Sequence, residues 1–373
     1  MDETVPASIR LPKDQVCVHN GKDIKGILSE TMMLAHLKDL ANANKVYKSY
    51  QGAGYYPTNI PSVIRRNVLE NPNWYTPYTP YQAEISQGRL ESLLNYQTMI
   101  TELTGLDVAN ASLLDESTSA AEAMFMAYNL HNGKRNKFFL SSTVFPQTIE
   151  VIKTKADGLG IELVIDEPAN FNWEKADEFC GYLVQNPDNF GNLHDITATA
   201  AKLKEHKVIV TIVADILSLA ITKTPGEMGA DIAVGSAQRF GVPMAYGGPH
   251  AGFMAVKDEL KRKMPGRLIG VSKDVHGNQA FRMSLQTREQ HIRRDKATSN
   301  ICTAQALLAN ISAFFGQWHG AKGLKAQAIK IRSYANIFIG ELECLGFKIV
   351  TDRINHFDTV TFDAKASGFE SSD

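Results

Sequence analysis

The residues of this chain that are best suited to chemistry lie in a glycine-rich stretch between two apolar runs. Residues 235–252 read Gly-Ser-Ala-Gln-Arg-Phe-Gly-Val-Pro-Met-Ala-Tyr-Gly-Gly-Pro-His-Ala-Gly. The flanking runs, 231–234 and 253–256, have the length and apolar character of buried strands. A helix is excluded between them because glycine loses backbone entropy and proline lacks an amide donor. The stretch is either a tight crossover loop or a place where backbone approaches a bound molecule.

A strand followed by polar residues and a glycine-rich turn is typical of one class of enzymes. Fold type I pyridoxal-phosphate enzymes keep their Schiff-base lysine in such a place. This chain has no lysine between Lys223 and Lys257, and Gln238 and Arg239 occupy the expected position. A guanidinium stays protonated at ordinary pH and cannot form an imine. We therefore predict a degenerate cofactor site that makes no covalent bond to pyridoxal phosphate.

Asp215 is a further candidate for this degenerate site. It comes shortly after the apolar run 208–213, which reads as a fully buried strand. Ligands gather at the carboxyl ends of strands in open α/β sheets, and a carboxylate there could pair with a pyridinium nitrogen. A helix cap or a salt bridge would explain Asp215 equally well.

An aromatic segment is the second candidate for chemistry. Tyr75, Tyr78 and Tyr81 recur every three residues and are separated by Pro77 and Pro80. In an extended, polyproline-like conformation this spacing would line one edge with phenols. The segment is either the wall of a pocket or an aromatic loop packed on the core.

The composition excludes several classes of protein. The 373 residues can bury a large core, and 44% hydrophobic with 21% charged residues is ordinary for a globular chain. A net charge of −1 gives no general attraction to nucleic acid or membrane surfaces. No apolar run approaches the roughly 18 residues of a membrane span. The cysteines form no C-x-x-C pair, so we expect no metal site; they are Cys17, Cys180, Cys302 and Cys344.

Strand and helix patterns alternate through the middle of the chain, which predicts βαβ units and a mostly parallel sheet. The predicted strands are 137–140, 161–165, 181–184, 208–213, 230–234 and 253–256, and the predicted helices between them are 146–156 and 196–204. Earlier, a helix from Leu90 ends at Gly105, and another begins near 115–119. We expect that second helix to be capped by its own residues, because Asp115 and Glu116 would repel a phosphate there.

We expect three regions: an N-terminal arm with helices (1–60), a large α/β domain (61–318) and a small C-terminal α+β domain (319–373). The small domain offers two strand patterns, 347–350 and 357–362, before the sequence ends at Asp373. Because sheets usually need three or more strands, this domain looks incomplete. We therefore expect the isolated chain to be oligomeric or poorly soluble.

The most charged segment, 286–304, could also be read as an anion or nucleic-acid site. Its basic residues Arg288, Arg293 and Arg294 are interleaved with Glu289 and Asp295. Local salt bridges therefore explain the segment better than a nucleic-acid site.

Several of these stretches together resemble the P-protein of the glycine cleavage system. The similar blocks are 78–97, 103–112, 238–243, 246–250, 264–267 and 286–305, and they span the chain from about Asp2 to about Phe362. The resemblance is to the N-terminal half of that family. It implies a fold type I architecture, with the mostly parallel sheet in the large domain.

The resemblance also implies a function. In that family pyridoxal phosphate is bound as a Schiff base by the C-terminal half, glycine is decarboxylated, and the aminomethyl group passes to the lipoyl arm of H-protein. This chain is then the N-terminal half or subunit of a glycine dehydrogenase (aminomethyl-transferring), inactive alone, with a C-terminal half and lipoylated H-protein as partners in an oligomer. We expect it in the mitochondrial matrix of a eukaryote or otherwise in the cytoplasm.

The residue patterns and the resemblance together give candidates for two sites. The substrate-channel candidates are Tyr78, Thr79, Tyr81, Gln82 and Glu84. The degenerate cofactor-site candidates are Asp215, Gln238 and Arg239. A competing hypothesis is a stand-alone pseudoenzyme or interaction scaffold with a degenerate cofactor site, which has the same sequence features.

Overall fold

The computed structural model forms two compact units, Met1–Gly52 and Ala53–Asp373. The residues it describes are 3–10, 17–19, 22–24, 29–48, 52–76, 79–248, 250–285, 290–294, 297, 301 and 305–369. The first unit contains η1 (Ala7–Ile9), β1 (Cys17–His19), β2 (Lys22–Ile24) and α1 (Glu30–Asn42). Helix α1 begins at Ser29, whose hydroxyl accepts a hydrogen bond from the Met32 amide.

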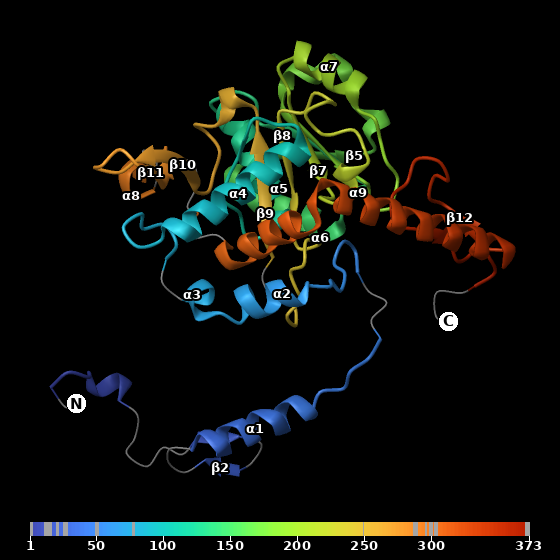
Figure 1. The fold of residues 1–373 in the computed structure, drawn as a ribbon. Coiled ribbons are helices and arrows are strands. Elements are labelled where there is room, and N and C mark those ends of the chain that lie inside the picture. Colours follow the sequence, from blue (N-terminus) through green and yellow to red (C-terminus); the bar gives the residue numbers. More distant parts are fainter. Residues whose placement is uncertain are drawn as a thin grey trace. The chain divides into compact units, whose positions relative to one another are not determined.

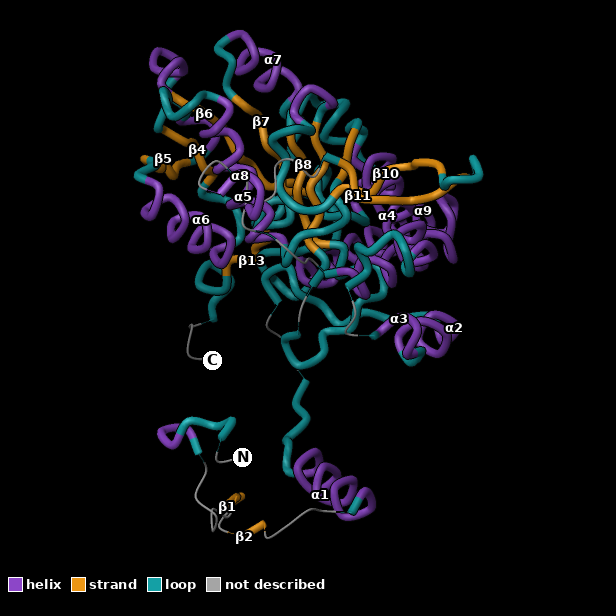
Figure 2. The backbone as a smooth tube through the Cα atoms, turned by 90° about the vertical axis from the view of Figure 1, so that its left-hand side faces the viewer, coloured by secondary structure: helices purple, strands orange, loops and turns teal. Residues whose placement is uncertain are grey.

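The second unit is built on a seven-stranded sheet with the order β3-β9-β8-β7-β6-β4-β5. Strands β8, β7, β6, β4 and β5 pair in parallel, and β9 pairs antiparallel with both β8 and β3. Figure 2 shows β5, β4, β6, β7 and β8 side by side. The strands are β3 (Val108–Ala109), β4 (Lys137–Ser141), β5 (Glu162–Asp166), β6 (Phe179–Asn186), β7 (Ile209–Ala214), β8 (Ile232–Ser236) and β9 (Gly252–Val256).

Helices cover both faces of this sheet (Figure 1). The helices of the second unit are α2 (Ser62–Ile64), α3 (Pro72–Tyr75), α4 (Gln87–Thr104), α5 (Glu116–Leu130), α6 (Pro146–Leu159), α7 (Thr197–Glu205), α8 (Gln290–Arg293) and α9 (Ala306–Cys344). Short turns are the π-turn η2 (Arg65–Leu69) and the 3-10 turns η3 (Pro168–Asn170), η4 (Trp173–Glu178), η5 (Ser218–Ala220) and η6 (Asp258–Leu260). Two antiparallel pairs stand apart from the large sheet: β10 (Leu268–Lys273) with β11 (Gln279–Ser284), and β12 (Lys348–Ile349) with β13 (Phe362–Asp363).

The core follows from the alternation of side chains along the strands. Phe138 and Leu140 of β4 pack with α5 and α6 on one face. Phe139, which lies between them, packs with Tyr182 and α7 on the opposite face. Farther along this second face, α4 and α9 cover Phe253 and Ala255 of β9. Because both faces are buried, the central strands read as continuous apolar runs.

Local sequence explains where the helices near the site begin and end. Helix α4 ends at Gly105, which has the left-handed φ of 66° that a C-terminal cap requires. Helix α5 begins at Asp115, whose side chain accepts a hydrogen bond from the Thr118 amide at 2.7 Å. The predicted self-capping of this helix is therefore confirmed. Helix α6 has Pro146 in its first turn, where a missing amide costs no hydrogen bond.

The predicted alternation of strands and helices and the mostly parallel sheet are confirmed. Two local predictions differ from the structure. The β10–β11 hairpin was not predicted, and the strand predicted over 357–362 is limited to Phe362–Asp363. Residues 357–361 instead contact the loop after β6 through Phe357 and Thr361, and Arg239 in the loop after β8 through Asp358.

The predicted regional boundaries at residues 60 and 318 stay predictions. The boundary between compact units falls at Gly52, and α9 runs through residue 318 but breaks its helical geometry at Gly320. Within the described ranges, no helix combines the length and apolar character that crossing a membrane requires.

Gly226 provides a test of how tightly the end of α4 packs against the chain before β8. Its amide donates to the Thr104 carbonyl at 2.9 Å, and a Cβ at this position would lie 1.9 Å from the Gly105 carbonyl oxygen. The obstructing atoms belong to the Gly105 backbone and cannot rotate away as a flexible side chain could, so we expect Gly226→Ala to lower the free energy of unfolding by about 2 to 3 kcal/mol. Chemical denaturation of the purified chain measures this change.

Gly158→Ala is the matched control, because a Cβ there meets nothing within 4 Å on an exposed turn of α6. It should raise the free energy of unfolding by about 0.5 to 1 kcal/mol. Equal effects of the two substitutions would contradict the close approach at Gly226.

Candidate functional site

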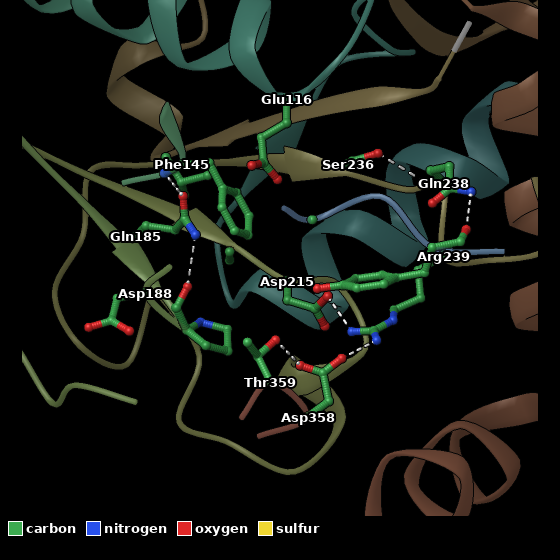
Figure 3. Close-up of a pocket in the computed structure, with 15 residues that line it drawn as sticks. Glu116, Phe145, Gln185, Asp188, Asp215, Ser236, Gln238, Arg239, Asp358 and Thr359 are labelled. Atoms are coloured by element: carbon green, nitrogen blue, oxygen red, sulfur yellow. Dashed lines mark hydrogen bonds and ion pairs between the residues drawn. The ribbon is translucent and has the colours of Figure 1, made fainter. Parts of the chain in front are cut away.

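A small cavity lies where the parallel strands β6, β7 and β8 end (Figure 3). Its volume is about 40 Å³. The lining residues come from the carboxyl ends of these strands, from the starts of α5 and α6, from the segment before α2, and from the chain before β13. They are Gly54, Tyr56, Glu116, Phe145, Gln185, Pro187, Asp188, Val213, Ala214, Asp215, Ser236, Gln238, Arg239, Asp358 and Thr359.

Arg239 occupies the centre of this site between two carboxylates. Its Nη1 lies 2.6 Å from Oδ2 of Asp215, and its Nη2 contacts Oδ2 of Asp358. Burial works against the charge on Arg239, but the carboxylates of Asp215 and Asp358 outweigh it and raise the pKa of the guanidinium. Arg239 is therefore a permanently charged ion-pair partner and not an amine that could form an imine.

Asp215 uses both of its carboxylate oxygens within the protein. Oδ1 accepts hydrogen bonds from the Leu217 and Ser218 amides at 3.0 and 2.8 Å, and Oδ2 pairs with Arg239. Burial raises the pKa of this carboxyl, and the guanidinium acts in the opposite direction. Asp215 thus caps the two backbone amides that follow it and forms a salt bridge with Arg239.

Aromatic rings and a peptide segment close the site around Arg239. The guanidinium lies 5.0 Å from the centre of the Tyr56 ring and 5.4 Å from that of Phe357. Burial, and after it the charge of Asp358, raises the pKa of the Tyr56 phenol. A neutral phenol and a cation close together favour the cation–π contact over an ionised pair.

Gln238 holds this covering segment in place. Its side-chain amide donates to the Tyr56 carbonyl at 3.1 Å and to the Val242 carbonyl at 3.0 Å. The Thr58 hydroxyl donates to the same Val242 carbonyl at 2.5 Å, and the Gln147 side chain donates to the Ala53 carbonyl at 2.6 Å. The buried Gln238 therefore joins the loop after β8 to residues 53–58.

Glu116 is another titratable side chain of this site with a shifted pKa. This half-buried side chain lies in the first turn of α5 and points into the cavity (Figure 3). Burial, together with the charges of Asp215 and Asp115, raises the pKa of its carboxyl to about 8. The same helix end that could bind an anion through its free amides is thus occupied by two acidic side chains.

These features do not fit bound pyridoxal phosphate. The described lining residues include no lysine, the helix end carries Asp115 and Glu116 where a phosphate would need donors, and Asp215 is already paired with Arg239. The volume of about 40 Å³ accommodates a few water molecules but is far below the roughly 300–1,000 Å³ of ligand pockets.

The residues predicted as substrate-channel candidates lie elsewhere. Of the described residues in that segment, which are Thr79, Tyr81, Gln82 and Glu84, none lines the cavity. Tyr81 is buried with its ring 5.6 Å from the Arg267 guanidinium, whereas Gln82 and Glu84 are exposed. Tyr78 falls outside the described residues. The structure thus brings Asp215, Gln238 and Arg239 together and leaves the tyrosine segment apart.

Sequence reasoning missed Tyr56 and Asp358 as members of the site. Both come from segments far from residue 239 in the chain, and neither lies in a stretch with a recognisable motif. Glu116 was identified only as a residue unfavourable to phosphate. Its approach to Asp215 depends on the packing of α5 across the strand ends, which no local pattern reveals.

The sheet, its helical layers and the position of the cavity define the architecture of a fold type I pyridoxal-phosphate enzyme, a class that uses this cofactor generally. The family model described as "Glycine cleavage system P-protein" matches residues 1–371. The chain belongs to the glycine cleavage system P-protein family.

Individual relatives support this assignment. A crystal structure of glycine decarboxylase (P-protein) of the glycine cleavage system, in inhibitor-bound form, superimposes with a TM-score of 0.84 and 35% identity. The match covers 95% of this chain and 80% of that chain. The mitochondrial glycine dehydrogenase (decarboxylating) B of Flaveria pringlei is 55% identical over 360 residues, which are 96% of this chain and 34% of the relative.

The glycine dehydrogenase (decarboxylating) of Aliivibrio fischeri is 53% identical over 361 residues, which are 97% of this chain and 36% of the relative. The chain therefore spans about a third of the length of these two relatives. The predicted family membership and fold type I class are confirmed.

Glu116 predicts a pH dependence of stability. Burial raises the pKa of this carboxyl from its ordinary value of 4.5 to about 8 in the folded chain, so between these values the folded state holds a proton that the unfolded state releases. Stability from this group is complete below about pH 4.5 and is lost as the pH rises through 8. Glu116→Gln should flatten the fall in melting temperature over this range.

The control is Glu84→Gln, which changes an exposed carboxyl outside the cavity. Its melting temperature should follow that of the unmodified chain from pH 5 to pH 9. If the Glu116→Gln curve also runs parallel to that of the unmodified chain, the raised pKa is wrong.

Proposed function

We propose that this chain is the N-terminal part of a glycine dehydrogenase (decarboxylating). The assembled enzyme decarboxylates glycine with pyridoxal phosphate and passes the aminomethyl group to the lipoyl arm of H-protein. The observation that carries this function is the match of the P-protein family model to residues 1–371. The 35% identity to a P-protein structure over 95% of the chain supports it.

In that enzyme this chain supports the structure and does not carry the cofactor. The C-terminal half or subunit holds pyridoxal phosphate, and none is bound covalently here. The support is local: Gln238 secures the covering segment, Arg239 is paired with Asp215 and Asp358, and the cavity is too small for the cofactor.

The partners follow from the same function. They are the C-terminal half or subunit, lipoylated H-protein and glycine, in a homo- or hetero-oligomer. In a eukaryote the assembly resides in the mitochondrial matrix, as the names of the Flaveria relatives indicate for those proteins, and in a bacterium it resides in the cytoplasm.

The tyrosine segment contributes to the substrate channel of the partner half. In this role the segment that carries the channel candidates Tyr78, Thr79, Tyr81, Gln82 and Glu84 adjoins the entrance of the partner's active site. The side chains of Gln82 and Glu84 are exposed. Tyr81 anchors the segment, since its buried ring lies against Arg267.

Reconstitution with a C-terminal half tests the division of roles. The two chains are mixed with pyridoxal phosphate, reduced with borohydride, digested and mapped by mass spectrometry. We expect one specifically labelled lysine in the C-terminal half and no specific label here, because a guanidinium cannot form an imine. Decarboxylation of glycine is measured on the same mixture with lipoylated H-protein.

Two results would count against this function. A single labelled lysine in the present chain would place the cofactor in the wrong half. Failure of the two chains to associate, with no gain in decarboxylation, would favour a stand-alone pseudoenzyme or scaffold.

Tyr81→Phe tests the channel assignment. We expect loss of the Tyr81 hydroxyl to disturb the segment that faces the partner and to reduce decarboxylation by the assembled enzyme about tenfold, the equivalent of one hydrogen bond of about 1.4 kcal/mol. The circular dichroism spectrum and melting temperature should stay unchanged. Tyr75→Phe, which alters a half-exposed tyrosine in α3, is the control. Unchanged kinetics for Tyr81→Phe would make Tyr81 an ordinary packing residue.

A further inference from the structure

Segments from three distant parts of the sequence meet at the Arg239 side chain. Tyr56 comes from the segment before α2, Asp215 follows β7, and Phe357 and Asp358 precede β13. Each contributes a ring or a carboxylate to the guanidinium. In the cofactor-binding members of this fold class, the corresponding position beyond the strand ends is where the ligand lies.

We propose that Arg239 is an internal replacement for a bound cofactor. Its guanidinium joins residues 53–58 and residues 356–359 to the ends of β7 and β8, and this half of the enzyme therefore keeps its closed structure without pyridoxal phosphate. This role concerns the conformational stability of the chain and is independent of the activity proposed above.

The first support is the arrangement of charge. Asp215 and Asp358 approach the same guanidinium from segments far apart in the sequence, and the side chains of Arg239 and Asp358 are 16% and 10% exposed. Without the cation, two largely buried carboxylates would face each other beside Glu116. Removing one partner of a buried ion pair is costly because it leaves the other charge uncompensated.

The second support is the shape of the group. A guanidinium is planar, so it can pair with two carboxylates through different nitrogens and still present a face to aromatic rings. Arg239 does both, with Tyr56 at 5.0 Å and Phe357 at 5.4 Å. A lysine ammonium would offer a point charge without this flat face.

The third support is that the two joined segments also hold other parts of the fold. The Leu193 amide donates to the Asn355 carbonyl at 2.8 Å, and the Thr351 hydroxyl donates to the Phe190 carbonyl at 2.7 Å. On the other side, residues 53–58 are bonded to Gln238 and Gln147. Losing the guanidinium therefore loosens both segments and the loop after β6.

Hydrogen exchange of an Arg239→Ala variant tests the proposal. We expect faster amide exchange at residues 53–58 and at 352–361 together, and a melting temperature lower by roughly 5 °C or more. Arg65→Ala is the matched control, because Arg65 pairs with Glu70 on the surface, with both side chains more than half exposed. It should change neither the exchange of these segments nor the melting temperature.

Small cations provide a readout that distinguishes a guanidinium site from general loss of packing. Millimolar methylguanidinium should partly restore the melting temperature of Arg239→Ala and slow exchange in both segments. Methylammonium at the same concentration should not, because it cannot pair with two carboxylates through a planar face. The proposal would be overturned if both cations raised the melting temperature of Arg239→Ala equally. It would also be overturned if methylguanidinium raised that of Arg65→Ala to the same extent, because binding would then be non-specific.

Asp358→Asn provides a second test if Arg239→Ala fails to fold. This change keeps Arg239 paired with Asp215 and removes only the ion pair to the C-terminal segment. Exchange should then increase at 352–361 and stay unchanged at 214–218. Unchanged exchange at 352–361 would show that the guanidinium does not hold this segment, and the proposal would be wrong.

Discussion

The cofactor-like site of this chain depends on one ionic contact, the Arg239 guanidinium between the carboxylates of Asp215 and Asp358. Two negative charges at the edge of a buried sheet are unfavourable unless a cation or protons compensate them. Here the cation belongs to the chain itself. Its position determines the shape of the cavity, the cover of aromatic rings and the path of the segments that meet there.

The same contact explains why the groups at this site do not fit an imine or a bound phosphate. An imine requires a neutral amine, and a phosphate requires uncompensated donors at a helix end. Arg239 supplies a fixed charge, while Asp115 and Glu116 occupy the first turn of α5. The architecture of the P-protein family is preserved around a site filled with protein groups.

The sequence predicted those site residues that directly follow a predicted strand, but not those that come from distant segments of the chain. Asp215, Gln238 and Arg239 were identified because each follows an apolar strand within a few residues, and parallel strands end at one edge. Tyr56 and Asp358 were not, because no periodicity links residues 56 and 358 to residue 239. The β10–β11 hairpin was missed for a different reason: its strands are only partly buried and show little alternation. The burial of Tyr81 likewise depends on packing that brings its ring against Arg267.

The long separation between Tyr56 and Asp358 has a consequence for synthesis of the protein. During translation, residues 53–58 and the strands β4 to β8 leave the ribosome well before Asp358 does. Until then Asp215 and Arg239 can pair with each other, but the C-terminal side of the site stays open to water. Contacts between distant residues form slowly because loop closure must precede them. The nascent chain thus passes through a stage in which most of its sheet is complete while the charged groups of the cavity are exposed, a stage at which a chaperone can bind it.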